Sequence, residues 1–249
     1  MTKEDYFYEA FQGMERLGPG SRESTEKALA FFPRKSQPVR ILDVGCGVGT
    51  HTFLLASHFP KADITAIDSH SPYIQTLNQS AAARGISDRV HGLEMSMFDM
   101  TFEKESFDLI WSEGAIYIIG FERGLKEWKR FLKPGGFQIC SEISWLKDDP
   151  SRESLDFWQS AYPQIGTIAE NLRRIEDAGY ISEGHFVCPV SDWTKEYYAP
   201  LQKNLDRIRN LYPDQPDALG AAAMLQSEID LYLRHKDDYS YVFYAMSRK

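Results

Sequence analysis

The segment 39–50, with the sequence VRILDVGCGVGT, constrains the fold of this chain more than any other. Its first half is rich in aliphatic and β-branched residues, which predicts a buried strand of a parallel sheet. Three alternate glycines follow, and residues 50–56 then predict a helix. Such a unit suits a nucleotide-type ligand, because glycine lets backbone approach the ligand and a helix N-terminus offers free N–H groups. A plain tight turn is the alternative.

The spacing of the glycines narrows the kind of ligand. A dinucleotide-binding turn has the pattern G-x-G-x-x-G, but here the third glycine comes one residue early and Thr50 holds the sixth place. This D-x-G-x-G-x-G form resembles the first motif of class I S-adenosylmethionine-dependent methyltransferases. In that family the turn passes under the methionine part of the cofactor, and the acidic residue lies near its amino group. The resemblance implies cofactor contacts from Asp43, Gly45, Cys46, Gly47, Gly49 and Thr50.

A second acidic residue ends the next predicted strand, 62–68. Asp68 lies about 20 residues past the glycines, where nucleotide-binding α/β folds place a carboxylate that accepts hydrogen bonds from ribose hydroxyls. Its two oxygens suit two neighbouring hydroxyls. The alternative is that Asp68 caps the following helix, which Ser69 and Ser71 can do unaided. We expect Asp68 and the adjacent Ser69 to contact the cofactor.

The adenine contacts depart from the family pattern. After a short predicted strand at 89–93, the family often has an acidic residue followed by a small or apolar one. Here Ser96 takes the acidic place and Met97 the next. A serine can still hydrogen-bond the adenine amino group, and a methionine packs on a ring through its polarisable sulfur. The alternative is that the methionines of this region are core residues, which we prefer for Met95 and Met100.

The segment 106–117 resembles the family's fourth motif. Residues 107–111 predict a strand, and ligands of open α/β sheets bind outside the carboxyl ends of the strands. We therefore expect Ser112, Glu113 and Tyr117 at the reaction zone, with Ser112 and Glu113 also near the cofactor. Glu113 is a candidate base or an anchor for a cationic acceptor, and the alternative is a loop glutamate. Tyr117 is expected to orient the acceptor, or to pack.

The remaining elements complete a fold class. A helix followed by LKPGG at 132–136 and a strand at 137–142 is typical of the same methyltransferases. Further strands are predicted at 180–187 and 239–246. The resemblance implies a Rossmann-like, doubly wound α/β sheet of seven strands, with the last strand antiparallel.

We expect one domain over 1–249, in three parts. Residues 1–38 form an N-terminal helical lid, or pack on the sheet edge, and 39–142 form the cofactor-binding core. Residues 143–249 supply the rest of the sheet and helical additions. Among these, the helices predicted at 193–211 and 216–236 form either a substrate cap or a dimer interface.

Composition excludes several other functions. The net charge of −8 gives no phosphate-binding surface, so we expect no nucleic-acid partner. No run approaches the ~20 apolar residues of a membrane span, and residues 1–12 carry no signal segment, so a cytoplasmic protein is expected. The three cysteines and six histidines show no metal-ligand spacing, and we expect no metal.

The predicted function is methyl transfer from S-adenosyl-L-methionine to a small-molecule acceptor, at a nitrogen, oxygen, sulfur or carbon atom, by in-line displacement. The resemblance is to the ubiquinone/menaquinone-biosynthesis-like branch. The N-P-P-Y-type tetrapeptide of nucleic-acid or protein methylation is replaced by Ser112-Glu113-Gly114-Ala115. Two alternatives stay open, namely a catalytically silent cofactor-binding module and an NAD-type oxidoreductase, which the early third glycine disfavours. A homodimer is possible.

Overall fold

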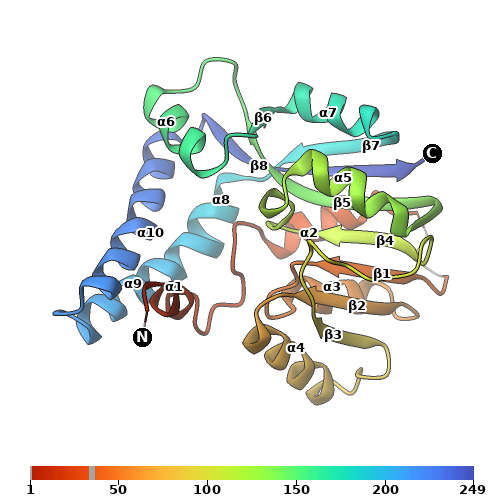
Figure 1. The fold of residues 1–249 in the computed structure, drawn as a ribbon, viewed down its shortest axis with the longest axis horizontal. Coiled ribbons are helices and arrows are strands. Elements are labelled where there is room, and N and C mark those ends of the chain that lie inside the picture. The colour runs from red at the N-terminus through yellow and green to blue at the C-terminus, as the bar shows by residue number, and fades with distance from the viewer. Residues whose placement is uncertain (1, 34–36) are drawn as a thin grey trace.

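The computed structural model describes residues 2–33 and 37–249, so residues 1 and 34–36 of the expected lid lie outside it. A central sheet with the strand order β3-β2-β1-β4-β5-β8-β7 organises the molecule (Figure 1). The strands from β3 to β5 pair in parallel, and β8 lies antiparallel between β5 and β7. This confirms the predicted doubly wound sheet with an antiparallel last strand. The bounds are β1 (Arg40–Val44), β2 (Asp63–Asp68), β3 (Val90–Glu94), β4 (Phe107–Ser112), β5 (Leu132–Trp145), β7 (Tyr180–Val187) and β8 (Tyr239–Arg248).

Two details of the sheet were not predicted. A strand of two residues, β6 (Gly166–Thr167), pairs with β5 and is too short to produce a sequence pattern. The LKPGG segment lies within β5 instead of forming a turn before it, because Leu132 already pairs with Phe107. The pairing register then shifts before Phe137, and Gly135 has a φ of +67°, so the Pro-Gly-Gly sequence produces an irregularity inside a long strand.

The core lies on both faces of the sheet because β1 and β4 are buried on both sides. All six residues of β4 are buried, as expected for a parallel strand that helices cover on both faces. Ile41 and Leu109 belong to one cluster of buried residues, while Leu42 and Ile110 belong to the other. The helices that complete these layers are α2 (Arg22–Leu29), α3 (Thr50–His58), α4 (Ser71–Ala83), α5 (Phe121–Trp128) and α7 (Ile168–Asp177).

The N-terminal and C-terminal additions pack together beyond one end of the sheet. Figure 1 shows α1 (Lys3–Ala10) beside α9 (Ala199–Leu211) and α10 (Pro216–His235), at the left of the view. The amide of Asn204 on α9 donates to the carbonyl of Ala10, over 2.8 Å. The remaining elements are α6 (Arg152–Ala161), α8 (Val190–Trp193), a π-helical turn η3 (Thr194–Tyr198), and the 3-10 turns η1 (Ile116–Ile118) and η2 (Lys129–Phe131). No helix among the described residues combines the length and apolar character that a membrane span requires.

Candidate active site

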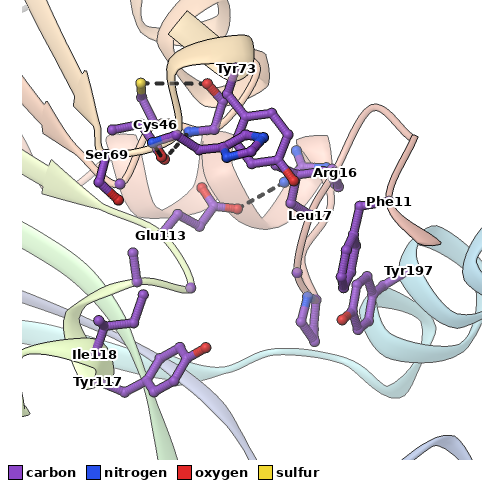
Figure 2. Close-up of a pocket in the computed structure, with 18 of the residues that line it drawn as sticks. Phe11, Arg16, Leu17, Cys46, Ser69, Tyr73, Glu113, Tyr117, Ile118 and Tyr197 are labelled. Atoms are coloured by element: carbon purple, nitrogen blue, oxygen red, sulfur yellow. Dashed lines mark hydrogen bonds and ion pairs between the residues drawn. The ribbon is translucent and has the colours of Figure 1, made fainter. Parts of the chain in front are cut away.

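A cavity of about 710 Å³ lies at the carboxyl ends of β1, β2 and β4. The strand order reverses between β1 and β4, and this is where ligands of doubly wound sheets bind. Figure 2 shows Cys46 and Ser69 on one side of the cavity and Tyr117 on another. Most predicted site residues meet here, and those that line the cavity are Gly45, Cys46, Gly47, Thr50, Asp68, Ser69, Ser96, Met97, Glu113 and Tyr117.

The glycine turn is held tightly against the end of β2. The backbone N–H groups of Gly45 and Cys46 both donate to the carbonyl of Ile67, at 2.9 and 3.0 Å. Gly45 has a φ of +75°, and a Cβ added there would lie 2.4 Å from the Cβ of Ala115. Only glycine fits this position, because the conformation is left-handed and the neighbouring loop is in contact.

Asp68 connects this turn to the next helix. Its Oδ2 accepts from the N–H of Gly47 at 3.0 Å, and its Oδ1 accepts from the N–H of His70 at 2.9 Å. A carboxylate has about four lone-pair positions, so these two bonds leave it able to accept from two further hydroxyls. The ring of Tyr8 on α1 stacks on His70 with centroids 4.0 Å apart, which covers this side of the cavity.

Three predicted cofactor residues lie behind the turn instead of lining the cavity. The carboxyl of Asp43 is buried and accepts from the Thr52 hydroxyl at 2.7 Å. Burial raises its pKa to about 6, although His51 and Thr52 oppose the shift. Ser112 donates to the Val44 carbonyl at 3.0 Å and joins β4 to β1. Gly49 begins α3 with a φ of +93°. These three residues support the turn from the side away from the cavity. Motif spacing alone does not reveal this position.

The predicted adenine contacts lie on the loop after β3. Ser96 and Met97 line the cavity, and the Ser96 Oγ accepts from the N–H of Phe98 at 3.2 Å. The hydroxyl hydrogen of Ser96 is still able to donate. Met95, which we preferred as a core residue, lines the cavity as well as packing on the core, whereas Met100 is buried.

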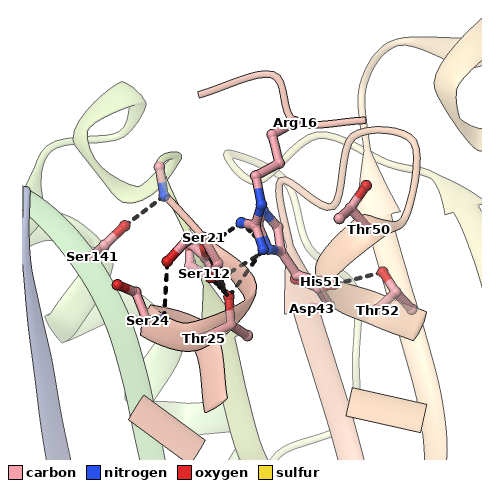
Figure 3. Close-up of polar contacts among 12 residues, drawn as sticks. Arg16, Ser21, Ser24, Thr25, Asp43, Thr50, His51, Thr52, Ser112 and Ser141 are labelled. Atoms are coloured by element: carbon pink, nitrogen blue, oxygen red, sulfur yellow. Dashed lines mark hydrogen bonds and ion pairs between the residues drawn. The ribbon is translucent and has the colours of Figure 1, made fainter. Parts of the chain in front are cut away.

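Glu113 is enclosed by polar partners. Its side chain is 1% exposed, and Oε1 lies 2.9 Å from Nη1 of Arg16 (Figure 2). Oε2 lies 3.0 Å from Nδ1 of His51, and the Thr25 hydroxyl oxygen lies 3.0–3.1 Å from both carboxylate oxygens. Figure 3 shows Arg16, His51 and Thr25 converging from three separate segments. Burial alone would raise the pKa of this carboxyl, but His51, Arg16 and Thr25 outweigh it and hold the pKa below its ordinary value.

Comparison with known proteins identifies the central part of the chain. Residues 41–136 match the family model described as a methyltransferase domain. This part of the chain is therefore similar to methyltransferase domains.

Relatives and a solved structure extend this match beyond the domain. A sterol 24-C-methyltransferase of Gibberella zeae is 27% identical over 184 residues, 70% of this chain and 48% of that protein. Phosphoethanolamine N-methyltransferase 1 of Arabidopsis thaliana is 25% identical over 205 residues, 81% of this chain and 39% of that protein. This chain therefore spans less than half the length of either relative. The crystal structure of an S-adenosylmethionine-dependent methyltransferase from Geobacter sulfurreducens, in complex with S-adenosyl-L-homocysteine, has a TM-score of 0.84 at 20% identity and 98% coverage of both chains, which shows the shared fold.

Away from the glycine turn, the cavity continues to an aromatic end. Tyr117 lies on η1, and its ring meets that of Tyr162 edge-on with centroids 5.9 Å apart. Burial, with the negative charges of Glu228 and Glu142, raises the pKa of the Tyr117 hydroxyl to about 12. Tyr117 is therefore a neutral hydrogen-bond donor at neutral pH.

Sequence reasoning missed Arg16, His51 and Glu228, which all line the cavity. For Arg16 and His51 we find no sequence signal, since each is a single polar residue in a segment without periodicity. Glu228 has one. It stands between Leu225 and Ile229 on the buried face of α10, and a lone acid on an apolar helix face requires a partner. Among the described residues, no group of histidine, cysteine and acidic side chains is arranged to hold a metal ion.

Proposed function

We propose that this chain transfers a methyl group from S-adenosyl-L-methionine to a small-molecule acceptor. The observation that supports this most is the single cavity that contains both the glycine turn with Asp68 and a wall of aromatic side chains. Its volume of about 710 Å³ falls in the range of ligand-binding pockets. One end suits the polar cofactor, and the other suits an acceptor with an apolar body.

The residues of the polar end fit the cofactor. Asp68 accepts from the ribose hydroxyls, Ser96 and Met97 hold the adenine, and the turn from Gly45 to Gly47 lies along the methionine part. Bound S-adenosylmethionine supplies an electrophilic methyl group on a positively charged sulfur. The tight turn at Gly45, where an added Cβ would meet Ala115, supports a close approach of backbone to ligand.

The chain's own contribution to the reaction is mainly placement. Aligning an acceptor in line with the methyl contributes up to about 7–11 kcal/mol in favourable systems. Phe7, Tyr8 and Phe11 of the N-terminal segment line the cavity and exclude water from it, and Tyr117 orients the acceptor. Glu113 orders the segment around Arg16, because its carboxylate already has three partners. We assign it a positioning role in place of the general base considered from the sequence.

The finer features remain predictions. One relative is named a sterol C-methyltransferase and another a phosphoethanolamine N-methyltransferase, so the acceptor atom differs among relatives. Four further features also remain predictions. They are the ubiquinone/menaquinone-like branch, the cytoplasmic location, the homodimer and the lack of a nucleic-acid partner.

Thermal unfolding with added ligands tests the proposal. S-adenosylmethionine and S-adenosylhomocysteine are expected to raise the melting temperature, because a ligand that binds only the native state stabilises it. NADH is the comparison ligand. A shift with NADH alone would favour an oxidoreductase. Binding of S-adenosylmethionine without S-adenosylhomocysteine release, across amine, alcohol, thiol and carbon acceptors, would favour a silent binding module.

A further inference from the structure

The end of the cavity away from the glycine turn is walled by aromatic rings from several elements. The rings belong to Tyr117, Trp158, Tyr162, Trp193, Tyr197 and Tyr241. Trp193 stacks on Tyr241 with centroids 5.3 Å apart, and the Tyr117 and Tyr162 rings meet edge-on. Aromatic faces carry negative potential, so a wall of this kind attracts positive charge.

One acidic side chain, Glu228 of α10, lines the same end of the cavity. Its Oε1 accepts from the Tyr198 hydroxyl at 3.0 Å, and the side chain is only half-buried because it borders the cavity. Burial raises the pKa of Glu228 above its ordinary value, and the Tyr198 hydrogen bond opposes only part of this shift. The side chain therefore lies in an apolar environment with one neutral partner.

The negative charge of Glu228 also affects the pKa of neighbouring tyrosine hydroxyls. Burial, followed by the charge of Glu228, raises the pKa of Tyr117 and Tyr197. In the described parts of the chain, the basic cavity-lining residues are Arg16, His51 and His70, which belong to the cofactor end. Arg16 and His51 are already paired with Glu113. The aromatic end thus combines a carboxyl group and ring faces with no cation of its own.

We propose that the methyl acceptor is an amine, and that Glu228 and the aromatic wall bind it as an organic cation. This rests on the proposed function and specifies its substrate. A cation over ring faces gains ~0.5–2 kcal/mol, most where water is excluded. An ammonium beside Glu228 also gives that carboxylate a cationic partner in addition to the neutral Tyr198 hydroxyl.

The same arrangement suits the methyl transfer. The ammonium of a primary or secondary amine gives a proton to the Glu228 carboxylate. The freed nitrogen lone pair then forms the new C–N bond while the C–S bond breaks, and the sulfur keeps that electron pair. Positive charge thus moves from sulfur to nitrogen, where the ring faces of Tyr117 and its neighbours stabilise it. Glu228 would be a catalytic residue in this scheme.

A pair of probes with the same skeleton tests the inference. Protein loaded with S-adenosylhomocysteine is titrated calorimetrically with 2-phenylethylamine and with 2-phenylethanol. We expect the amine to bind at least tenfold more tightly. Glu228→Gln keeps an acceptor for Tyr198 and is expected to weaken the amine at least tenfold, while the alcohol changes by less than about threefold. Tyr117→Phe should retain amine binding, whereas Tyr117→Leu, which removes the ring, should weaken it.

Asp230→Asn is the matched control, because Asp230 is exposed on the same helix. It should leave both probes unchanged. Equal or tighter binding of the alcohol, no measurable amine binding, or an unchanged amine affinity in Glu228→Gln would each overturn the inference. Affinity for S-adenosylhomocysteine is measured in every variant, and the titrations are repeated without it. A failure of the cofactor proposal is thereby distinguished from a failure of the amine proposal.

Discussion

Nη1 of Arg16 lies 2.9 Å from Oε1 of Glu113, although 97 positions separate the two residues in the chain. Both side chains are buried, with exposures of 8% and 1%. The pair joins the segment after α1 to the loop after β4, at the wall of the cavity. A Cβ added at Gly20 would lie 2.7 Å from the same Glu113 oxygen, so the N-terminal segment passes directly over this carboxylate.

The first prediction concerns this pair. Glu113→Gln leaves Arg16 buried without its counter-charge, and breaking a buried pair costs about 3–5 kcal/mol. We expect a loss of that size in the free energy of unfolding, measured with urea. Adding Arg16→Met should recover at least about 1 kcal/mol of it, because contacting residues are energetically coupled.

An exposed pair provides the control for this experiment. Arg22 and Glu26 lie 2.8 Å apart with side chains 66% and 47% exposed, and Glu26→Gln should cost less than about 1 kcal/mol. A Glu113→Gln protein of unchanged stability, with turnover lowered by roughly 10²–10⁴, would instead indicate a general base.

The second prediction concerns the glycine turn. Gly45→Ala combines a left-handed conformation with a Cβ 2.4 Å from Ala115. It should therefore lower the melting temperature and abolish measurable binding of S-adenosylhomocysteine. Gly85→Ala is the matched control, because Gly85 has a φ of +66° but nothing within 4 Å of the added Cβ. That variant should show only the conformational strain of ~1–2 kcal/mol and normal binding. Similar behaviour of the two variants would mean that the Ala115 loop moves away.

The third prediction concerns Asp68. Asp68→Asn replaces one carboxylate oxygen with an amino group and removes the charge. We expect the dissociation constant of S-adenosylhomocysteine to rise by a factor equivalent to about 1–3 kcal/mol. Asp63→Asn on the same strand is the control, since that side chain is 54% exposed at the opposite end of β2. Unchanged affinity in Asp68→Asn would remove this residue from the cofactor site.

Much of the fold could be predicted because its strands are local patterns. β1 and β4 are short, mainly apolar segments, and a glycine lies within two residues of the end of each. The sequence does not predict the two-residue β6 or the start of β5 at Leu132, because pairing with a distant strand defines both.

The site residues also fall into two groups, those that sequence spacing predicts and those that only the folded structure brings together. The turn and Asp68 lie within one strand-turn-helix-strand unit, so spacing is enough to find them. Arg16 and Glu228 reach the cavity from opposite ends of the chain, and only the packing of α1 against α9 and α10 brings those ends together. The positions of Asp43 and Ser112 behind the turn depend on side-chain direction, which a motif does not specify.

Glu142 of β5 is a buried acid that is not among the residues lining the cavity. It is 0% exposed, and neither carboxylate oxygen has a hydrogen-bond partner of normal geometry among the described residues. Burial raises the pKa of this carboxyl to about 8, and the nearby Tyr162 hydroxyl and Arg174 charge offset only part of the shift.

The fourth prediction follows from this raised pKa. Below the ordinary pKa of 4.5, Glu142 is protonated in the folded and the unfolded chain, and its contribution to stability is complete. Between 4.5 and about 8 the unfolded chain ionises while the folded chain does not, so stability falls as pH rises. Glu142→Gln removes this dependence. From pH 5 to pH 9, the free energy of unfolding should therefore fall further in the wild type than in the variant, by on the order of a few kcal/mol.

Asp43 titrates in both proteins, so its contribution cancels in the comparison. Parallel pH profiles of the two proteins would show that Glu142 is already ionised in the folded state, with a partner that compensates its burial.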